Sequence, residues 1–75
     1  MNKVEMLREQ LGLTRAELAR KAEINYMTLW LIEREPDYKT SYETADKICS
    51  VLEQPLETVF PDYKRKSPYP TSGST

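Results

Sequence analysis

The feature that most constrains this chain is a pair of predicted helices separated by only three residues. Thr14-Arg15-Ala16-Glu17 has the pattern of a capping box, in which two side chains satisfy the free N–H groups at a helix start. It predicts a helix over residues 15–22. Asn25 is a favourable N-cap for a second helix over residues 26–33. Because only residues 23–25 lie between them, the two helices must cross at a steep angle.

The apolar pattern places a small residue at this crossing and predicts three further helices. Ala19 is the small residue, and Leu29 and Ile32 supply the apolar contacts from the second helix of the pair. The first of the further helices follows an Asn2 N-cap, carries Val4, Leu7 and Leu11 at helical spacing, and ends at Gly12. Of the other two, one follows a Ser41 N-cap and has apolar residues from Ala45 to Leu52, and one runs from Pro55 at a first helical position to Val59-Phe60. No segment alternates as a strand would. The predicted fold is all-α, with five helices in one compact domain.

Length and composition exclude several classes of function. The chain has 75 residues, one cysteine (Cys49), no histidine and only two glycines. These counts leave no histidine metal site, no Ser-His-Asp triad, no intramolecular disulfide and no phosphate loop. No apolar run is long enough to span a membrane, and the N-terminal residues lack a secretory pattern. We therefore expect a cytoplasmic binding module that is not an enzyme and has no cofactor and no metal.

The charges are unevenly distributed along the chain. Residues 1–34 carry a net charge of +1, residues 35–62 carry −5, and residues 63–75 carry +3. The last segment is rich in Pro, Ser and Thr and has no apolar period, which predicts a disordered, basic tail over residues 62–75 after a domain over residues 1–61. The tail composition also suits a linker, in which case the chain is the N-terminal domain of a longer protein.

The sequence resembles the Cro/CI-type helix-turn-helix domain, also called the lambda repressor-like or XRE family. The similarity covers about 57 of the 75 residues and is carried by Val4, Leu7-Arg8-Glu9, Gly12-Leu13-Thr14, Glu17-Leu18-Ala19, Ile24, Thr28-Leu29, Ile32-Glu33-Arg34, Ser41, Glu43-Thr44-Ala45, Lys47-Ile48, Leu52 and Leu56 through Phe60. It implies a five-helix fold and double-stranded DNA as the partner, with the third helix in the major groove. The function it implies is sequence-specific transcription regulation, of the repressor kind that phages, mobile elements and antitoxins use.

The sequence departs from the family pattern at a few positions. Glu23 and Glu53 stand where the family usually has glycines, so each must adopt a backbone conformation that favours glycine. Arg15 stands where glutamine is common. The loop over residues 35–40 is about one residue longer than usual and more acidic.

The third predicted helix turns an apolar face outward. Helical geometry places Tyr26, Met27, Trp30 and Leu31 opposite Leu29 and Ile32. In a major groove these side chains can contact thymine methyl groups, and the Tyr26 hydroxyl can donate a hydrogen bond. No Arg, Gln or Asn occupies the central outward positions, and these residue types make the paired hydrogen bonds that identify a base. The sequence therefore predicts weaker recognition of base sequence by this helix, or a preference for A·T steps. Two alternatives stay open. Such an apolar face also suits binding to a protein partner, as in an anti-repressor, and it could instead be buried within the domain or in a dimer.

The remaining predicted DNA contacts flank this face. Asn25 and Thr28 lie at the start of the third helix, and Arg15 and the N-terminus of the second helix can hold one phosphate together. Further contacts are predicted for Arg34 and for Lys39, Thr40 and Ser41. For Arg8, Arg20 and Lys21 we expect solvated surface charges, because each has a glutamate within helical reach.

A single domain of this kind covers one half-site, so the sequence predicts a homodimer on DNA. The candidate interface is Val59, Phe60 and Tyr63. The alternative is that most apolar residues around the fifth helix simply close the core of one chain.

Overall fold

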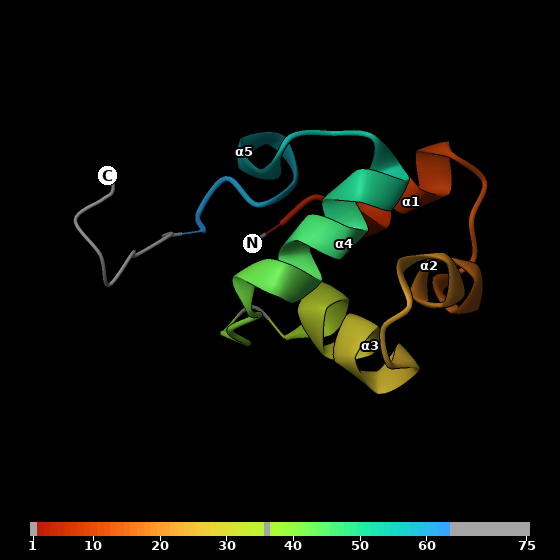
Figure 1. The fold of residues 1–75 in the computed structure, drawn as a ribbon, viewed down its shortest axis with the longest axis horizontal. Helices are drawn as coiled ribbons and strands as arrows, with labels where there is room; N and C mark the ends of the chain where they lie inside the picture. Colours follow the sequence, from red (N-terminus) through yellow and green to blue (C-terminus); the bar gives the residue numbers. More distant parts are fainter. Residues whose placement is uncertain (1, 36, 64–75) are drawn as a thin grey trace.

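The computed structural model describes residues 2–35 and 37–63, which form five helices and no strand. They are α1 (Val4–Gln10), α2 (Arg15–Ala22), α3 (Tyr26–Arg34), α4 (Tyr42–Leu52) and α5 (Leu56–Val59). Figure 1 shows α4 in the middle of the molecule, with α2 and α3 on one side and α5 on the other. The predicted all-α fold is therefore confirmed.

The predicted helix starts are confirmed at three of the five helices. The Thr14 side chain accepts a hydrogen bond from the Glu17 backbone N–H at 3.0 Å, and the Glu17 carboxylate accepts one from Thr14 N–H at 2.8 Å. The hydrogen bond from the Thr14 backbone lowers the pKa of Glu17. The Asn25 and Ser41 side chains also cap α3 and α4, by accepting from the Met27 and Thr44 backbone N–H groups. Local side-chain acceptors thus define where α2, α3 and α4 begin.

The first and last helices begin one residue away from the predicted positions. Lys3, and not Asn2, is the N-cap of α1, although the Asn2 Oδ1 accepts a hydrogen bond from Val4 N–H at 3.0 Å. The Asn2 Nδ2 donates to the Ile32 carbonyl oxygen at 2.9 Å, which ties the N-terminal segment to α3. Pro55 is the N-cap of α5 and not its first helical residue, because its ψ of 158° is extended.

The short link between α2 and α3 uses a left-handed residue. Glu23 has φ 58° and ψ 46°, and Glu53 after α4 has φ 57°, as their positions at usual glycine sites predict. A non-glycine residue in this conformation costs about 1 kcal/mol. The reversal at Glu23 lets the Ile24 N–H donate to the Ala19 carbonyl oxygen at 3.0 Å. It turns the chain so that α3 packs directly against α2.

A core formed by all five helices fixes how α2 and α3 lie. Ala19 is 3% exposed, Leu29 is fully buried, and Ile32 is 3% exposed, as predicted for the crossing. α4 packs against α1, α2 and α5 through its buried face, which consists of Ala45, Ile48, Cys49 and Leu52. Burial raises the pKa of the Cys49 thiol to about 11, so the thiol stays protonated near neutral pH and serves the core.

The two ends of the described chain meet beside α5. The Lys3 N–H donates to the Val59 carbonyl oxygen at 2.8 Å. The described chain ends shortly after α5, at Tyr63, and most of the predicted tail, residues 64–75, lies outside the described residues. No helix in the described part of the chain is both long and apolar enough to cross a membrane.

Candidate nucleic-acid interface

Helix α3 has one face in the core and one face outside it. Tyr26 and Met27 are 46% and 56% exposed, whereas Leu29 and Ile32 of the same helix are buried. Trp30 and Leu31 are half-buried, which is less exposed than their angular position predicts. Neither belongs to the core cluster or to the side chains packed against it. The four residues of the predicted outward face therefore lie outside the core, and those of the first turn of α3, Tyr26 and Met27, are the most exposed to solvent.

The two polar residues predicted to contact DNA at the start of α3, Asn25 and Thr28, differ in exposure. Asn25 is exposed, and its Oδ1 accepts a hydrogen bond from the Met27 backbone N–H at 2.7 Å. Its side chain therefore holds the helix start. Thr28 is half-buried.

A buried carboxylate joins α3 to the beginning of α2 and to α1. The Glu33 side chain has no exposed surface, and its Oε1 accepts a hydrogen bond from Arg15 Nε at 3.0 Å. The Arg15 Nη1 donates to the Tyr26 hydroxyl oxygen at 3.4 Å. The hydrogen bonds to Tyr26 and to Glu33 raise the pKa of Arg15. Arg15 thus contacts both ends of α3 from the first turn of α2.

Arg8 is the second partner of Glu33, and our expectation that it is a solvated surface charge is wrong. It is 7% exposed, and its Nε and Nη2 donate to the two Glu33 oxygens at 2.8 and 3.2 Å. Its Nη1 donates to the Leu13 carbonyl oxygen at 2.9 Å. Sequence reasoning paired Arg8 with a glutamate one helical turn away, whereas its partner lies 25 residues along the chain. Two guanidinium groups share one carboxylate, which leaves a surplus of one positive charge.

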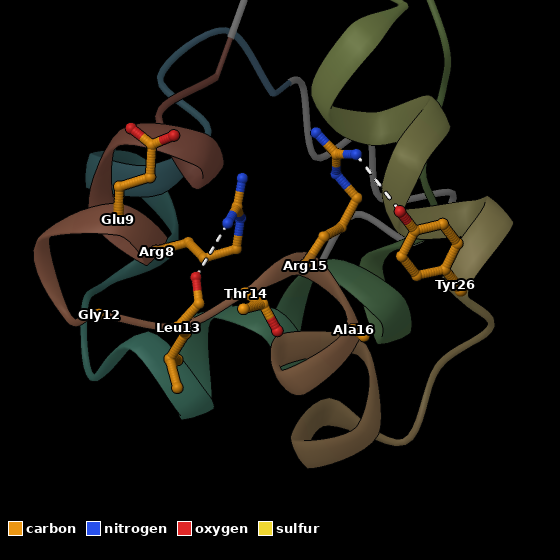
Figure 2. Close-up of a pocket in the computed structure, with 8 residues that line it drawn as sticks. All are labelled: Arg8, Glu9, Gly12, Leu13, Thr14, Arg15, Ala16 and Tyr26. Carbon is orange, nitrogen blue, oxygen red and sulfur yellow. Dashed lines mark hydrogen bonds between the residues drawn. The ribbon is translucent and has the colours of Figure 1, made fainter.

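A cleft of about 520 Å³ opens beside this cluster (Figure 2). It is lined by Arg8, Glu9, Gly12, Leu13, Thr14, Arg15, Ala16 and Tyr26. In Figure 2 the Arg15 side chain reaches from α2 toward the Tyr26 hydroxyl. The cleft therefore adjoins the exposed first turn of α3, and its charged lining consists of Arg8, Arg15 and Glu9.

The predicted contacts that follow α3 are spread over two elements. Arg34 is exposed and lies 3.8 Å from Glu5 in a loose ion pair. Lys39 is exposed, whereas the Thr40 Oγ1 is buried and has no hydrogen-bond partner among the described residues. Ser41 is exposed, and its Oγ accepts from Thr44 N–H at 3.2 Å as the N-cap of α4. Of this group, Lys39 presents the most available charge.

The three residues of the predicted dimer interface lie mostly in the core of one chain. Val59 is fully buried and Phe60 is 6% exposed. Tyr63 is half-buried and packs edge-to-face on Phe60, with ring centroids 6.2 Å apart. Tyr63 alone of the three keeps appreciable surface for a second copy.

Comparison with known families agrees with this geometry. A family model described as helix-turn-helix matches residues 4–59, which includes all five helices. The chain belongs to the helix-turn-helix family of the Cro/CI-like (XRE) type, a family of DNA-binding transcription regulators. No curated protein matched the chain.

Proposed function

We propose that this protein is a sequence-specific transcriptional repressor that places α3 in the major groove of DNA. The observation that carries the proposal is the exposed first turn of α3, where Tyr26 and Met27 project from a helix whose opposite face is buried. A helix held in this way can enter a groove while its buried side chains stay packed in the core. Family membership supports DNA as the ligand.

The charges near α3 support contacts to the DNA backbone on both sides of the groove. On one side, Arg15 borders the cleft from the first turn of α2, and its side chain is 21% exposed. On the other side, Lys39 is exposed in the loop before α4. Backbone contacts of this kind fix the position of a protein on DNA but carry no sequence information.

The first expected result is a steep dependence of duplex binding on salt. With about three or four phosphate contacts per protomer, the affinity should fall roughly 40- to 150-fold between about 50 and about 200 mM salt. Selection from random duplexes supplies the ligand, and fluorescence anisotropy at several salt concentrations measures the slope. A flat slope contradicts the proposal.

A pair of lysine variants tests whether Lys39 makes one of these phosphate contacts. Lys39→Ala should lower the slope of log affinity against log salt by about one, because one phosphate contact is lost. Lys47→Ala is the matched control, since the Lys47 ammonium already lies 4.0 Å from Glu43 on α4. Equal slopes for the two variants would remove Lys39 from the interface.

We further propose that two copies bind together on a two-fold symmetric DNA site. One chain presents a single α3 and has a net charge of −1, so a second copy adds the contacts that one copy lacks. Of the residues considered, Tyr63 offers surface for this pairing. Sedimentation of the protein with a selected duplex should give two chains per duplex, and one chain per duplex at saturation contradicts the pairing.

A protein partner on the same α3 face is the second candidate function. It is favoured by the exposure of Tyr26 and Met27 without a charged side chain among the outward residues of the first turn. The duplex selection separates the two candidates, because a protein-binding module recovers no duplex above the background of random sequence.

A further inference from the structure

Two polar side chains near the start of α3 that could read base edges, Asn25 and Arg15, already make hydrogen bonds within the protein. Asn25 is the sole amide side chain near the start of α3, and its Oδ1 accepts the 2.7 Å hydrogen bond that caps the helix. Reading adenine with an amide requires its oxygen and its nitrogen together. The capping bond directs the Asn25 oxygen toward the α3 backbone, so adenine readout would have to share that oxygen with the cap.

The nearer of the two arginines beside α3 is engaged as well. Arg15 donates from Nε to Glu33 and from Nη1 to the Tyr26 hydroxyl, so two of its three side-chain nitrogens already have partners within the protein. Pairing with guanine through two parallel N–H groups would have to use the edge formed by Nη1 and Nη2, beside the contact to Tyr26. Arg34 lies at the opposite end of α3, where its Nη1 is 3.8 Å from Glu5.

The side-chain surface that remains on α3 is largely apolar. Met27 is 56% exposed and has no donor, and Tyr26 is 46% exposed with its hydroxyl oxygen accepting a hydrogen bond from Arg15. Trp30 and Leu31 continue this surface as half-buried side chains outside the core cluster. In the major groove, the apolar group that such side chains can contact is the C5-methyl group of a pyrimidine.

We propose that the surface formed by Tyr26, Met27, Trp30 and Leu31 recognises DNA through pyrimidine C5-methyl groups. This inference rests on the proposed function, since it requires α3 to lie in the major groove. Thymine carries this methyl group, and 5-methylcytosine carries it at the same ring position. The protein therefore distinguishes methylated from unmethylated cytosine at the positions that Met27 contacts, and it distinguishes thymine from uracil there.

The test removes and restores single methyl groups in a duplex selected for binding. Replacing thymines one at a time by deoxyuridine should lower the affinity about fourfold at one or two positions, which corresponds to about 0.8 kcal/mol per buried methyl group. At the same positions, a cytosine-guanine pair should bind more weakly than a 5-methylcytosine-guanine pair by a similar factor. A loss with uracil but no gain with 5-methylcytosine would contradict the inference, because the same C5-methyl group would then have no effect on a cytosine.

Two methionine variants show whether α3 is responsible. Met27→Ala should bind the thymine and deoxyuridine duplexes with nearly equal affinity, because the side chain that contacts the methyl group is gone. Met6→Ala is the matched control, since Met6 is 47% exposed on α1 and should keep the fourfold difference. If the wild-type protein binds the selected duplex but tolerates uracil at every position, this inference fails and the proposed function stands. If the wild-type protein binds no duplex, the proposed function and this inference both fail, and the second candidate function, a protein partner on the outward face of α3, is left.

Discussion

Replacing Glu33 with alanine is expected to destabilise the domain by about 3–5 kcal/mol, because it leaves the Arg8 guanidinium buried without a counter-charge. Arg8 is 7% exposed, and two of its three side-chain nitrogens donate to Glu33. The total stability of a chain of this length is of the order of 4–11 kcal/mol, so much of it should be lost. Urea denaturation followed by circular dichroism measures the change.

A surface ion pair supplies the matched control for this experiment. Glu43 pairs with Lys47 one helical turn away, and its side chain is 84% exposed. Glu43→Ala should therefore cost less than about 0.5 kcal/mol. Glu33→Gln keeps an oxygen acceptor near Arg8 and should cost less than Glu33→Ala. Similar stabilities for Glu33→Ala and Glu43→Ala would show that the buried cluster does not hold α1 to α3.

Replacing Met27 with glutamate is expected to weaken DNA binding at least about 100-fold without unfolding the protein. Met27 is 56% exposed in the first turn of α3, where a carboxylate interacts favourably with the helix dipole. In the major groove the same carboxylate faces two phosphate backbones, and such like-charge contacts cost several kcal/mol. Anisotropy titration with the selected duplex measures the loss, and circular dichroism checks the fold.

The control for this variant introduces the same charge elsewhere. Met6→Glu places a carboxylate on α1 at a side chain of similar exposure and changes the net charge by the same amount. It should weaken binding less than about threefold, since only long-range repulsion acts and salt screens it. Equal losses for Met6→Glu and Met27→Glu would mean that the overall charge, and not the position of α3, controls binding.

Local chemistry explains why most of the fold could be predicted from the sequence. The side-chain acceptors of Thr14, Asn25 and Ser41 satisfy N–H groups within three residues of themselves, so the starts of α2, α3 and α4 depend on short stretches of chain. The left-handed conformations of Glu23 and Glu53 follow from equally local positions after helices. The burial of Ala19, Leu29 and Ile32 follows from helical periodicity alone.

Contacts between distant segments explain what could not be predicted. The sequence by itself determined five helices, the crossing of α2 and α3, and an apolar outward face at the start of α3. Only the tertiary structure decided that Arg8 and Arg15 share the buried Glu33, that Trp30 and Leu31 are half-buried, and that the Thr40 hydroxyl turns inward. These features arise where separate helices and loops pack together, and neither the spacing of residues within one helix nor their individual propensities specifies which side chains meet there.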